Sequence, residues 1–459
     1  MMEPEFQLLH QRALNRDSSL VSELKNLKPS HFPEVSTRLR FAPLFFKLGL
    51  YREGLSFLDL SDAKAHRDQR LRDLALLWGA RLLNGAGARS LACDLVQRVS
   101  NIPVELLPVV AGIYLSSGFF KEALQHFNTY FESGATELLV SIGRIDALIG
   151  LEQYEKALAD WSSIDQSEAP PLHLGILHEQ KAEILIGLGL FEEAWEELTV
   201  SDELIPTTDQ SVDRAFLEKW KGYCLAKLQK DPKEAEQAFS RARKILSKKG
   251  RAVNLEAHLD LLRWKVGLLS DEDAHTLSTH PAVSKKIRSE LRSADKPKPD
   301  HKDSVLKIYP RSGEVFFSGK YSLRLGKEVE FLSILSLSGH WGIGTEELKS
   351  LLWAKDLFSY TYMGDRLNQI LYRLKRYHVI SIERLPNGRL RLSDPSLISV
   401  DSEKTRPSFL EGRRTFSGAE FSEYYSIGKT QRQIHLAKWL ENSWIRVLGC
   451  GSATHYEVI

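Results

Sequence analysis

Cysteine is scarce in this chain of 459 residues, which has only Cys93, Cys224 and Cys450. Their wide separation excludes a disulfide framework and the closely spaced thiols of a zinc site. The amino terminus lacks a basic segment followed by an apolar run, so we expect no secretory signal. The longest uncharged apolar stretch, Leu106–Phe120, is interrupted by Pro108 and is too short to span a bilayer. These absences predict a cytoplasmic protein with no membrane segment.

Arrangements typical of enzymes are also missing. No Ser/His/Asp or Cys/His combination stands out from chance. Gly428-Lys429-Thr430 is similar to the end of a phosphate-binding loop, but position 423 is glutamate where that loop requires glycine. His173 and His178 are five residues apart, so a helix does not direct both at one metal ion. We therefore expect a protein that is not an enzyme and has no cofactor or metal.

The charges are unevenly distributed, although the net charge is only +2. Residues 301–459 hold 23 basic and 17 acidic residues, so 39 and 43 of the chain's 62 and 60 remain in residues 1–300. A mildly acidic front half therefore precedes a basic back. This asymmetry is typical of a protein in which only the carboxy-terminal part contacts a polyanion.

A short pattern recurs through the front half: a small residue, an aromatic, one or two charges, then alanine or glycine. Its final small residue falls at positions 54, 92, 123, 157, 194 and 235. The copies are Gly49–Gly54, Gly118–Ala123, Leu151–Ala157 and Gly189–Ala194, with weaker ones at Gly87–Ala92 and Asp231–Ala235. The spacing resembles degenerate tetratricopeptide repeats, which are stacked helix pairs. The resemblance implies an α-solenoid over residues 1–284 with a protein or peptide ligand in its concave face. A helical layer that only shapes the molecule is the alternative.

Residues 285–303 combine proline with charge, as in Lys296-Pro297-Lys298-Pro299, which predicts an extended linker. Short strands then follow at Val305–Tyr309, Glu314–Phe317 and Tyr321–Leu325. Three apolar stripes predict helices, on Val329–Leu337, Leu348–Trp353 and Leu367–Leu374. Val379–Ile382 and Arg389–Leu392 are predicted to pair around the Asn387-Gly388 turn.

This order of elements over residues 304–393 resembles the OmpR-type winged helix-turn-helix. The matching segments are Gly319–Leu325, the Glu346–Trp353 helix that ends on tryptophan, and Leu371–Arg376. The chain departs from the family in the aromatic loop Ala354–Tyr362 and in the ending of the wing. Nothing in the sequence resembles the phosphoacceptor domain that usually accompanies this module. Residues 394–414 are predicted to form a polar connector.

The third helix carries the predicted chemistry. With its apolar stripe inward, the opposite face presents Arg366, Gln369, Arg373 and Arg376. Arginine and glutamine can form paired hydrogen bonds with guanine and adenine in a major groove. Tyr372 and Lys375 are expected at phosphates, and Arg389, beside the wing turn, in a minor groove. A solvated basic helix face is the alternative.

Residues 415–459 resemble a second, small winged helix with Phe416, Phe421 and Tyr425 in a first helix and Lys429–Asn442 in a recognition-type helix. Lys429, Gln431, Gln433 and His435 are its candidate DNA contacts, but a protein-contact or structural role is open. The fold expected is mainly α: an α-solenoid plus one or two small α+β winged-helix domains. The function expected is a sequence-selective regulator that binds double-stranded DNA, with a homodimer possible. The alternative is a protein–protein adaptor whose winged helices contact proteins.

Overall fold

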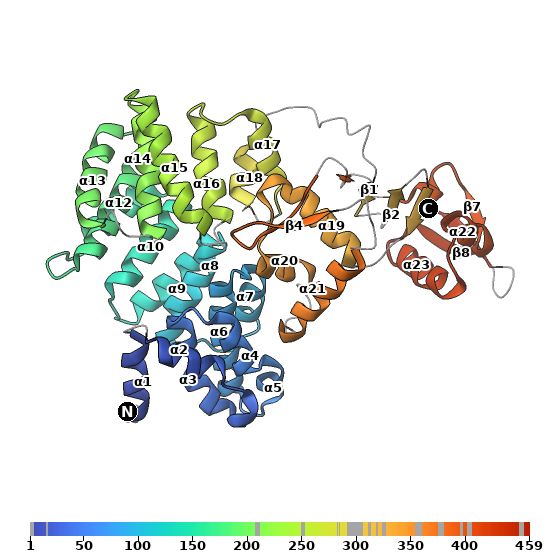
Figure 1. Cartoon of the computed structure of the whole chain (residues 1–459), viewed down its shortest axis with the longest axis horizontal. Coiled ribbons are helices and arrows are strands. Elements are labelled where there is room, and N and C mark those ends of the chain that lie inside the picture. Colours follow the sequence, from blue (N-terminus) through green and yellow to red (C-terminus); the bar gives the residue numbers. More distant parts are fainter. Residues whose placement is uncertain are drawn as a thin grey trace.

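The computed structural model is mainly helical, as predicted, with small sheets in its carboxy-terminal part (Figure 1). It describes residues 4–459 except 15–16, 207–211, 249–252, 282, 284, 292–305, 311–313, 318–319, 324–326, 354–359, 375–380, 395–397, 402–405 and 449–453. We call residues 4–291 the repeat region, 306–401 the central domain and 406–459 the C-terminal domain. Across the residues described, no helix combines the length and apolar character needed to cross a membrane.

The repeat region is built of antiparallel helix pairs. Two short helices, α1 (Pro4–Leu14) and α2 (Ser18–Lys25), precede them. The pairs are α3 (Val35–Lys47) with α4 (Tyr51–Leu58), α6 (Gln69–Ala86) with α7 (Arg89–Val96), α8 (Leu107–Ser116) with α9 (Phe120–Glu132), α10 (Leu138–Gly150) with α11 (Tyr154–Ser162), α12 (Pro171–Gly187) with α13 (Phe191–Leu204), and α14 (Val212–Lys227) with α15 (Pro232–Lys248). The short helix α5 (Leu60–Ala65) is inserted after the first pair.

The recurring sequence pattern has a packing cause. All six marker positions lie in the second helix of a pair and are buried. At Gly54 a Cβ atom would come 2.7 Å from the Cβ of Phe45, so the two helices of that pair touch through the glycine. Three second helices start with an aromatic that covers a glycine of the next pair: Tyr51 covers Gly85, Phe120 covers Gly150 and Tyr154 covers Gly187. These pairs therefore interlock with the next through a small residue and a ring.

Three more helices end the repeat region: α16 (Val253–Lys265), α17 (Asp271–Thr279) and α18 (Lys285–Leu291). The last corrects the predicted linker 285–303, because residues 285–291 form a packed helix. Leu291 is fully buried, and Lys286 Nζ donates to the carbonyl oxygen of Gly150 at 3.1 Å. Apolar side chains at Val283 and Leu291 favour burial over an extended, solvated conformation. The proline-containing part of the linker lies outside the described residues.

The central domain has the predicted element order. Its strands are β1 (Leu306–Tyr309), β2 (Glu314–Phe317) and β3 (Lys320–Leu323), and its helices are α19 (Lys327–Ser338), α20 (Thr345–Leu352) and α21 (Tyr360–Leu374). The hairpin strands are β4 (Ile382–Arg384) and β5 (Leu390–Leu392). Gly388 has φ of +81°, which suits the Asn-Gly turn. Ile343, between α19 and α20, pairs with Leu390 of the hairpin.

The sheet includes a strand that the sequence reading assigned to a polar connector. Its order is β3-β2-β1-β6, and β6 (Ile398–Val400) runs parallel to β1. Ile398 is buried, and its carbonyl oxygen accepts a hydrogen bond from the Ser336 hydroxyl at 3.0 Å. The expected boundary at residue 393 was therefore too early. A parallel pairing between strands so distant in the sequence leaves no local sequence signal.

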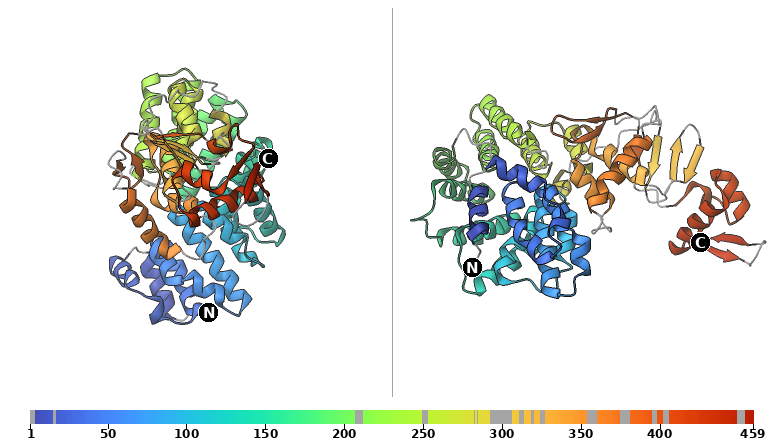
Figure 2. Two further views of the ribbon diagram at one scale, coloured as in Figure 1. Left: turned by 90° about the vertical axis from the view of Figure 1, so that its right-hand side faces the viewer. Right: turned by 60° about the horizontal axis from the view of Figure 1, so that its bottom comes forward.

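The C-terminal domain contains β7 (Thr415–Ser417), α22 (Gly418–Tyr425), α23 (Lys429–Glu441), β8 (Ile445–Leu448) and β9 (His455–Val458), in the strand order β7-β9-β8. Phe409 and Leu410, in the presumed connector, are part of its apolar core. The buried Glu314 carboxylate of β2 joins the two domains. It accepts hydrogen bonds from the Tyr425 hydroxyl at 2.7 Å and from the Ser408 backbone amide at 2.8 Å. Figure 2 shows this domain beyond the sheet, away from the repeat region.

The central domain docks on the repeat region at both ends of the helix array. Helices α20 and α21 contact α7 and α4 from the early pairs, whereas α19 contacts α17 from the end. One continuous apolar core runs from residues of α2 and α3 through to α21 and β6. The array therefore curves so that its beginning and its end hold the same domain (Figure 1).

Candidate nucleic-acid interface

Helix α21 separates an apolar face from a polar one. Its inward residues are Met363, Leu367, Ile370 and Leu374, all buried. The opposite face is solvent-exposed and carries four of the predicted contact residues, namely Arg366, Gln369, Tyr372 and Arg373. The apolar spacing of i, i+4 and i+7 produces this division, because such positions share one side of a helix. Two guanidinium groups, an amide and a phenol are thus presented together.

Asn368 belongs to the same polar face, although the sequence reading did not single it out. With Gln369, Tyr372 and Arg373 it lines an open hollow on α21. The sequence did hold a signal for it, because Asn368 stands four residues before Tyr372 and such pairs are neighbours on a helix. Asn368 therefore adds a second amide to this polar face, and asparagine is a side chain that can form two hydrogen bonds with adenine in a major groove.

Arg373 has a partner within the domain. Its Nη1 donates to Glu328 Oε1 of α19 at 2.6 Å, and the arginine side chain is still 60% exposed. Exposed ion pairs contribute about 0–1 kcal/mol to stability. The guanidinium can therefore exchange this carboxylate for a phosphate or a base edge at little cost. Lys375 and Arg376, the other predicted contacts of this helix, lie outside the described residues.

Arg389 is not where the sequence reading expected it. We predicted an exposed side chain beside the wing turn, but its exposed fraction is only 2%. Its two terminal nitrogens donate to both carboxylate oxygens of Glu256 on α16, at 2.9 and 2.8 Å. A charge this deeply buried requires an opposite charge, and the repeat region supplies it. The minor-groove contact predicted for Arg389 is therefore wrong for this conformation.

Other polar contacts join the same two parts of the chain. The carbonyl oxygen of Gly342, on the segment that pairs with the hairpin, receives a hydrogen bond from His280 Nε2 at 3.0 Å. Arg52 of α4 pairs with Glu346 and donates to the Thr345 hydroxyl, both at the start of α20. The docked face of the central domain therefore includes its hairpin and the start of α20, while the polar face of α21 stays open to solvent.

Burial at this interface shifts two pKa values in opposite senses. Burial lowers the pKa of His280 to about 4, partly offset by its hydrogen bond to Gly342. Burial raises the pKa of Glu347 to about 7, opposed by the charges of Arg89 and Arg389. Near neutral pH the histidine is therefore neutral, in the tautomer whose Nε2 carries the proton donated to the Gly342 carbonyl oxygen.

In the C-terminal domain, three candidate contacts are exposed on α23: Lys429, Gln431 and Gln433. His435 is 5% exposed and faces the core, so its proposed DNA contact is wrong in this structure. Leu440 is 37% exposed, and Ile434 is 56% exposed on the same helix. The surface of α23 therefore mixes polar and apolar side chains, which suits a protein contact as well as DNA.

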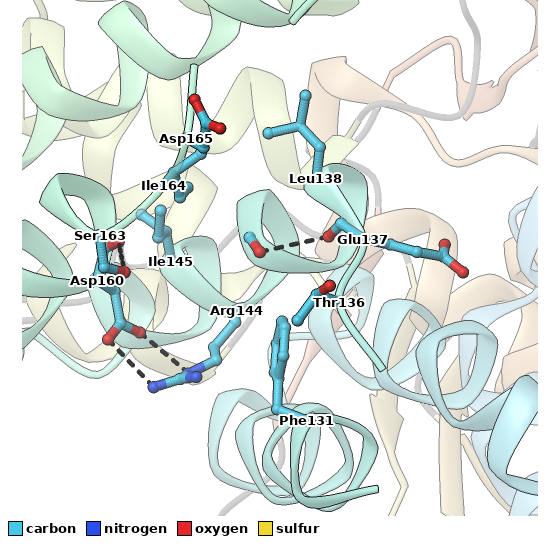
Figure 3. Close-up of a pocket in the computed structure, with 11 residues that line it drawn as sticks. Phe131, Thr136, Glu137, Leu138, Arg144, Ile145, Asp160, Ser163, Ile164 and Asp165 are labelled. Carbon is cyan, nitrogen blue, oxygen red and sulfur yellow. Dashed lines mark hydrogen bonds and ion pairs between the residues drawn. The ribbon is translucent and has the colours of Figure 1, made fainter. Parts of the chain in front are cut away.

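A cavity lies between α9, α10 and α11 in the repeat region (Figure 3). Its charged groups already have partners: the Arg144 guanidinium pairs with Asp160 at 3.0 Å, and Glu137 accepts a hydrogen bond from the Tyr130 hydroxyl at 2.8 Å. The cavity therefore offers little unsatisfied polarity to a ligand.

Comparison with known proteins assigns this chain to no family. No protein-family model matches the chain, and no curated protein matches it either.

Proposed function

We propose that this chain is a sequence-selective, DNA-binding transcriptional regulator. In this proposal the central domain acts as an OmpR-type winged helix, and the tetratricopeptide-like repeat region senses a protein or peptide. The observation that carries it is the polar face of α21, on which Arg366, Gln369 and Arg373 are exposed together over a buried apolar face. A helix of this kind fits a major groove and supplies the donors that read guanine and adenine.

The docked hairpin provides a way in which DNA binding would be regulated. An OmpR-type wing would contact DNA beside the recognition helix, yet here Arg389 of the hairpin is held by Glu256. The repeat region would thus withhold the wing while leaving α21 accessible. A signal that loosens the hairpin from α16 would add the wing to the DNA contacts and increase affinity.

The test is a titration of the full chain with fluorescently labelled genomic DNA fragments at several salt concentrations. The full chain is needed because the central domain shares an apolar core with the repeat region. We expect binding that weakens steeply with salt, through phosphate contacts, and enrichment of a subset of fragments, through base contacts. Absence of binding at the lowest salt concentration would contradict the proposal.

One observation favours the alternative, a protein–protein adaptor. The hairpin and α20 already make a protein contact, with the repeat region of the same chain. The same titration separates the two functions, because an adaptor would ignore DNA at every salt concentration.

A further inference from the structure

The first helices of three successive pairs, together with α16, carry a connected line of polar side chains through the repeat region. We call it the polar ladder; it consists of Asp146 on α10, Glu179, Gln180 and Glu183 on α12, Lys219 on α14 and His258 on α16. Gln180 Nε2 donates to Asp146 Oδ1 at 2.5 Å, which joins α12 to α10. Trp220 Nε1 donates to Glu183 Oε2 at 3.0 Å and its ring lies 5.6 Å from that of His258, which extends the connection to α14 and α16.

Three groups of the ladder are buried without a hydrogen-bond partner among the described residues. They are Glu179 Oε1, Gln180 Oε1 and Lys219 Nζ, on side chains that are 7%, 2% and 2% exposed. Lys219 Nζ lies 4.3 and 4.1 Å from the ring centroids of Phe216 and Trp220, but no described carboxylate oxygen comes within 4.0 Å of it. Leaving such groups unpaired is costly, so a molecule that pairs with them would bind there.

The unsatisfied groups define the chemistry of that molecule. Glu179 and Gln180 present acceptor oxygens and need donors, which an ammonium or guanidinium group provides. Lys219 presents donors and needs an acceptor, which a carboxylate provides. The ladder holds three carboxylates against the single ammonium of Lys219, so a ligand with net positive charge suits it best. Lys286 of α18 lies nearby, but its ammonium is already paired with Glu152 at 2.9 Å.

We propose that the polar ladder binds a basic α-amino acid, with its cationic groups at Glu179 and Gln180 and its carboxylate at Lys219. A metal ion is a poorer occupant, because the described residues contain no group of three ligating side chains placed to hold one. Asp146, Glu183 and His258 are only partly buried, so the ladder is open to solvent at these positions. A regulatory role for this ligand rests on the proposed function. The binding itself is measured without DNA, so its failure and the failure of the proposed function can be told apart.

The protonation states add a measurable signature. Burial raises the pKa of Asp146 to about 7 and that of Glu179 well above its ordinary value. An arriving cation favours the charged carboxylates and lowers both pKa values, so binding releases protons. The binding enthalpy should therefore differ between buffers of different ionisation enthalpy.

The experiment is isothermal titration of the full chain with L-arginine, L-lysine and agmatine, in phosphate and in Tris. Agmatine keeps the cationic groups of arginine but lacks its carboxylate, so arginine should bind at least tenfold more tightly. Glu179→Gln should weaken all three ligands at least tenfold. Lys219→Met keeps the aliphatic stem against the rings and should abolish the preference for arginine over agmatine.

Glu197→Gln is the matched control, because Glu197 is a partly buried carboxylate that pairs with His178 and Lys181 outside the ladder. It should bind arginine as the unmodified chain does. Circular dichroism establishes that each variant is folded, and Glu183→Gln replaces Glu179→Gln if the latter does not fold. Failure of all three ligands to bind the unmodified chain at millimolar concentration would overturn the proposal. Undiminished binding by a folded Glu179→Gln or Glu183→Gln variant would overturn it equally.

Discussion

Arg389 and Glu256, 133 positions apart in the sequence, form a buried bidentate ion pair that fastens the hairpin of the central domain to helix α16. The pair is 2% and 6% exposed, so neither charge can be compensated by water if the other is removed. The contact therefore couples the position of the hairpin to the integrity of the repeat region.

Glu256→Gln should release the hairpin. Removing one partner of a buried ion pair costs about 3–5 kcal/mol, because the other charge is left unpaired. We expect faster amide hydrogen exchange in residues 381–394 and, under the proposed function, tighter DNA binding. Glu236→Gln is the control, since its pair with Arg263 is largely exposed on the glutamate side. Unchanged exchange in the hairpin would show that the pair does not hold it.

Arg373→Ala should weaken specific DNA binding by about 1–3 kcal/mol if the side chain reads a base. The exposed pair with Glu328 adds little stability, so the folded state should be almost unaffected. Lys244→Ala removes an exposed cation from α15, away from α21, and should leave affinity unchanged. Equal affinities for Arg373→Ala and the unmodified chain would show that Arg373 does not contact a base.

His280→Gln should change the dependence of stability on pH. The pKa of His280 falls from 6.5 to about 4 on folding, so the stability that the neutral ring provides is complete above pH 6.5. It is lost as the pH falls from 6.5 towards 4, by about 2 kcal/mol at pH 5. Urea unfolding of both proteins at pH 7.5 and 5 should show that the unmodified chain loses about 2 kcal/mol relative to the variant as the pH falls. The raised pKa of Glu347 makes the fold more stable as the pH falls, which opposes the effect of His280. Glu347 is present in both proteins, so its effect cancels in the comparison.

Gly342→Ala should destabilise the central domain. Gly342 has φ of +63°, and a Cβ atom there would come 2.8 Å from the carbonyl oxygen of Leu390. Strain of this kind costs about 1–3 kcal/mol. Gly364→Ala is the matched control, because Gly364 is on α21 with open space around it and alanine favours helix by about 1 kcal/mol. A lower midpoint of thermal unfolding is expected for the first variant and an equal or higher one for the second.

Tyr425→Phe should loosen the C-terminal domain from the sheet. The tyrosine hydroxyl donates to Glu314, and burial together with that carboxylate raises the pKa of Tyr425. Without the hydroxyl, the fully buried carboxylate loses a donor, at a cost of about 1–3 kcal/mol. Amide hydrogen exchange in α22, residues 418–425, should become faster. Tyr424→Phe, on the neighbouring and more exposed ring, is the control.

The elements that could be predicted from sequence are those with local periodicity. Ala123 and Ala157 mark helix pairs because a small residue must recur wherever two helices touch, and α21 follows from the spacing of Leu367, Ile370 and Leu374. Two of the misses are non-local. The pairing of β6 with β1, and the burial of Arg389 against Glu256, depend on residues about a hundred positions away. His435 was assigned to the surface from its place in a motif, but the core of the C-terminal domain takes it inward.

The parallel pairing of β1 with β6 also determines how the central domain responds to mechanical force. The chain enters the domain at the start of β1 and leaves it at the end of β6, so these points lie at opposite ends of the two strands. Tension between the repeat region and the C-terminal domain would therefore load the β1–β6 hydrogen bonds in shear. All of them would have to break together, whereas a hairpin pulled at adjacent ends opens one bond at a time.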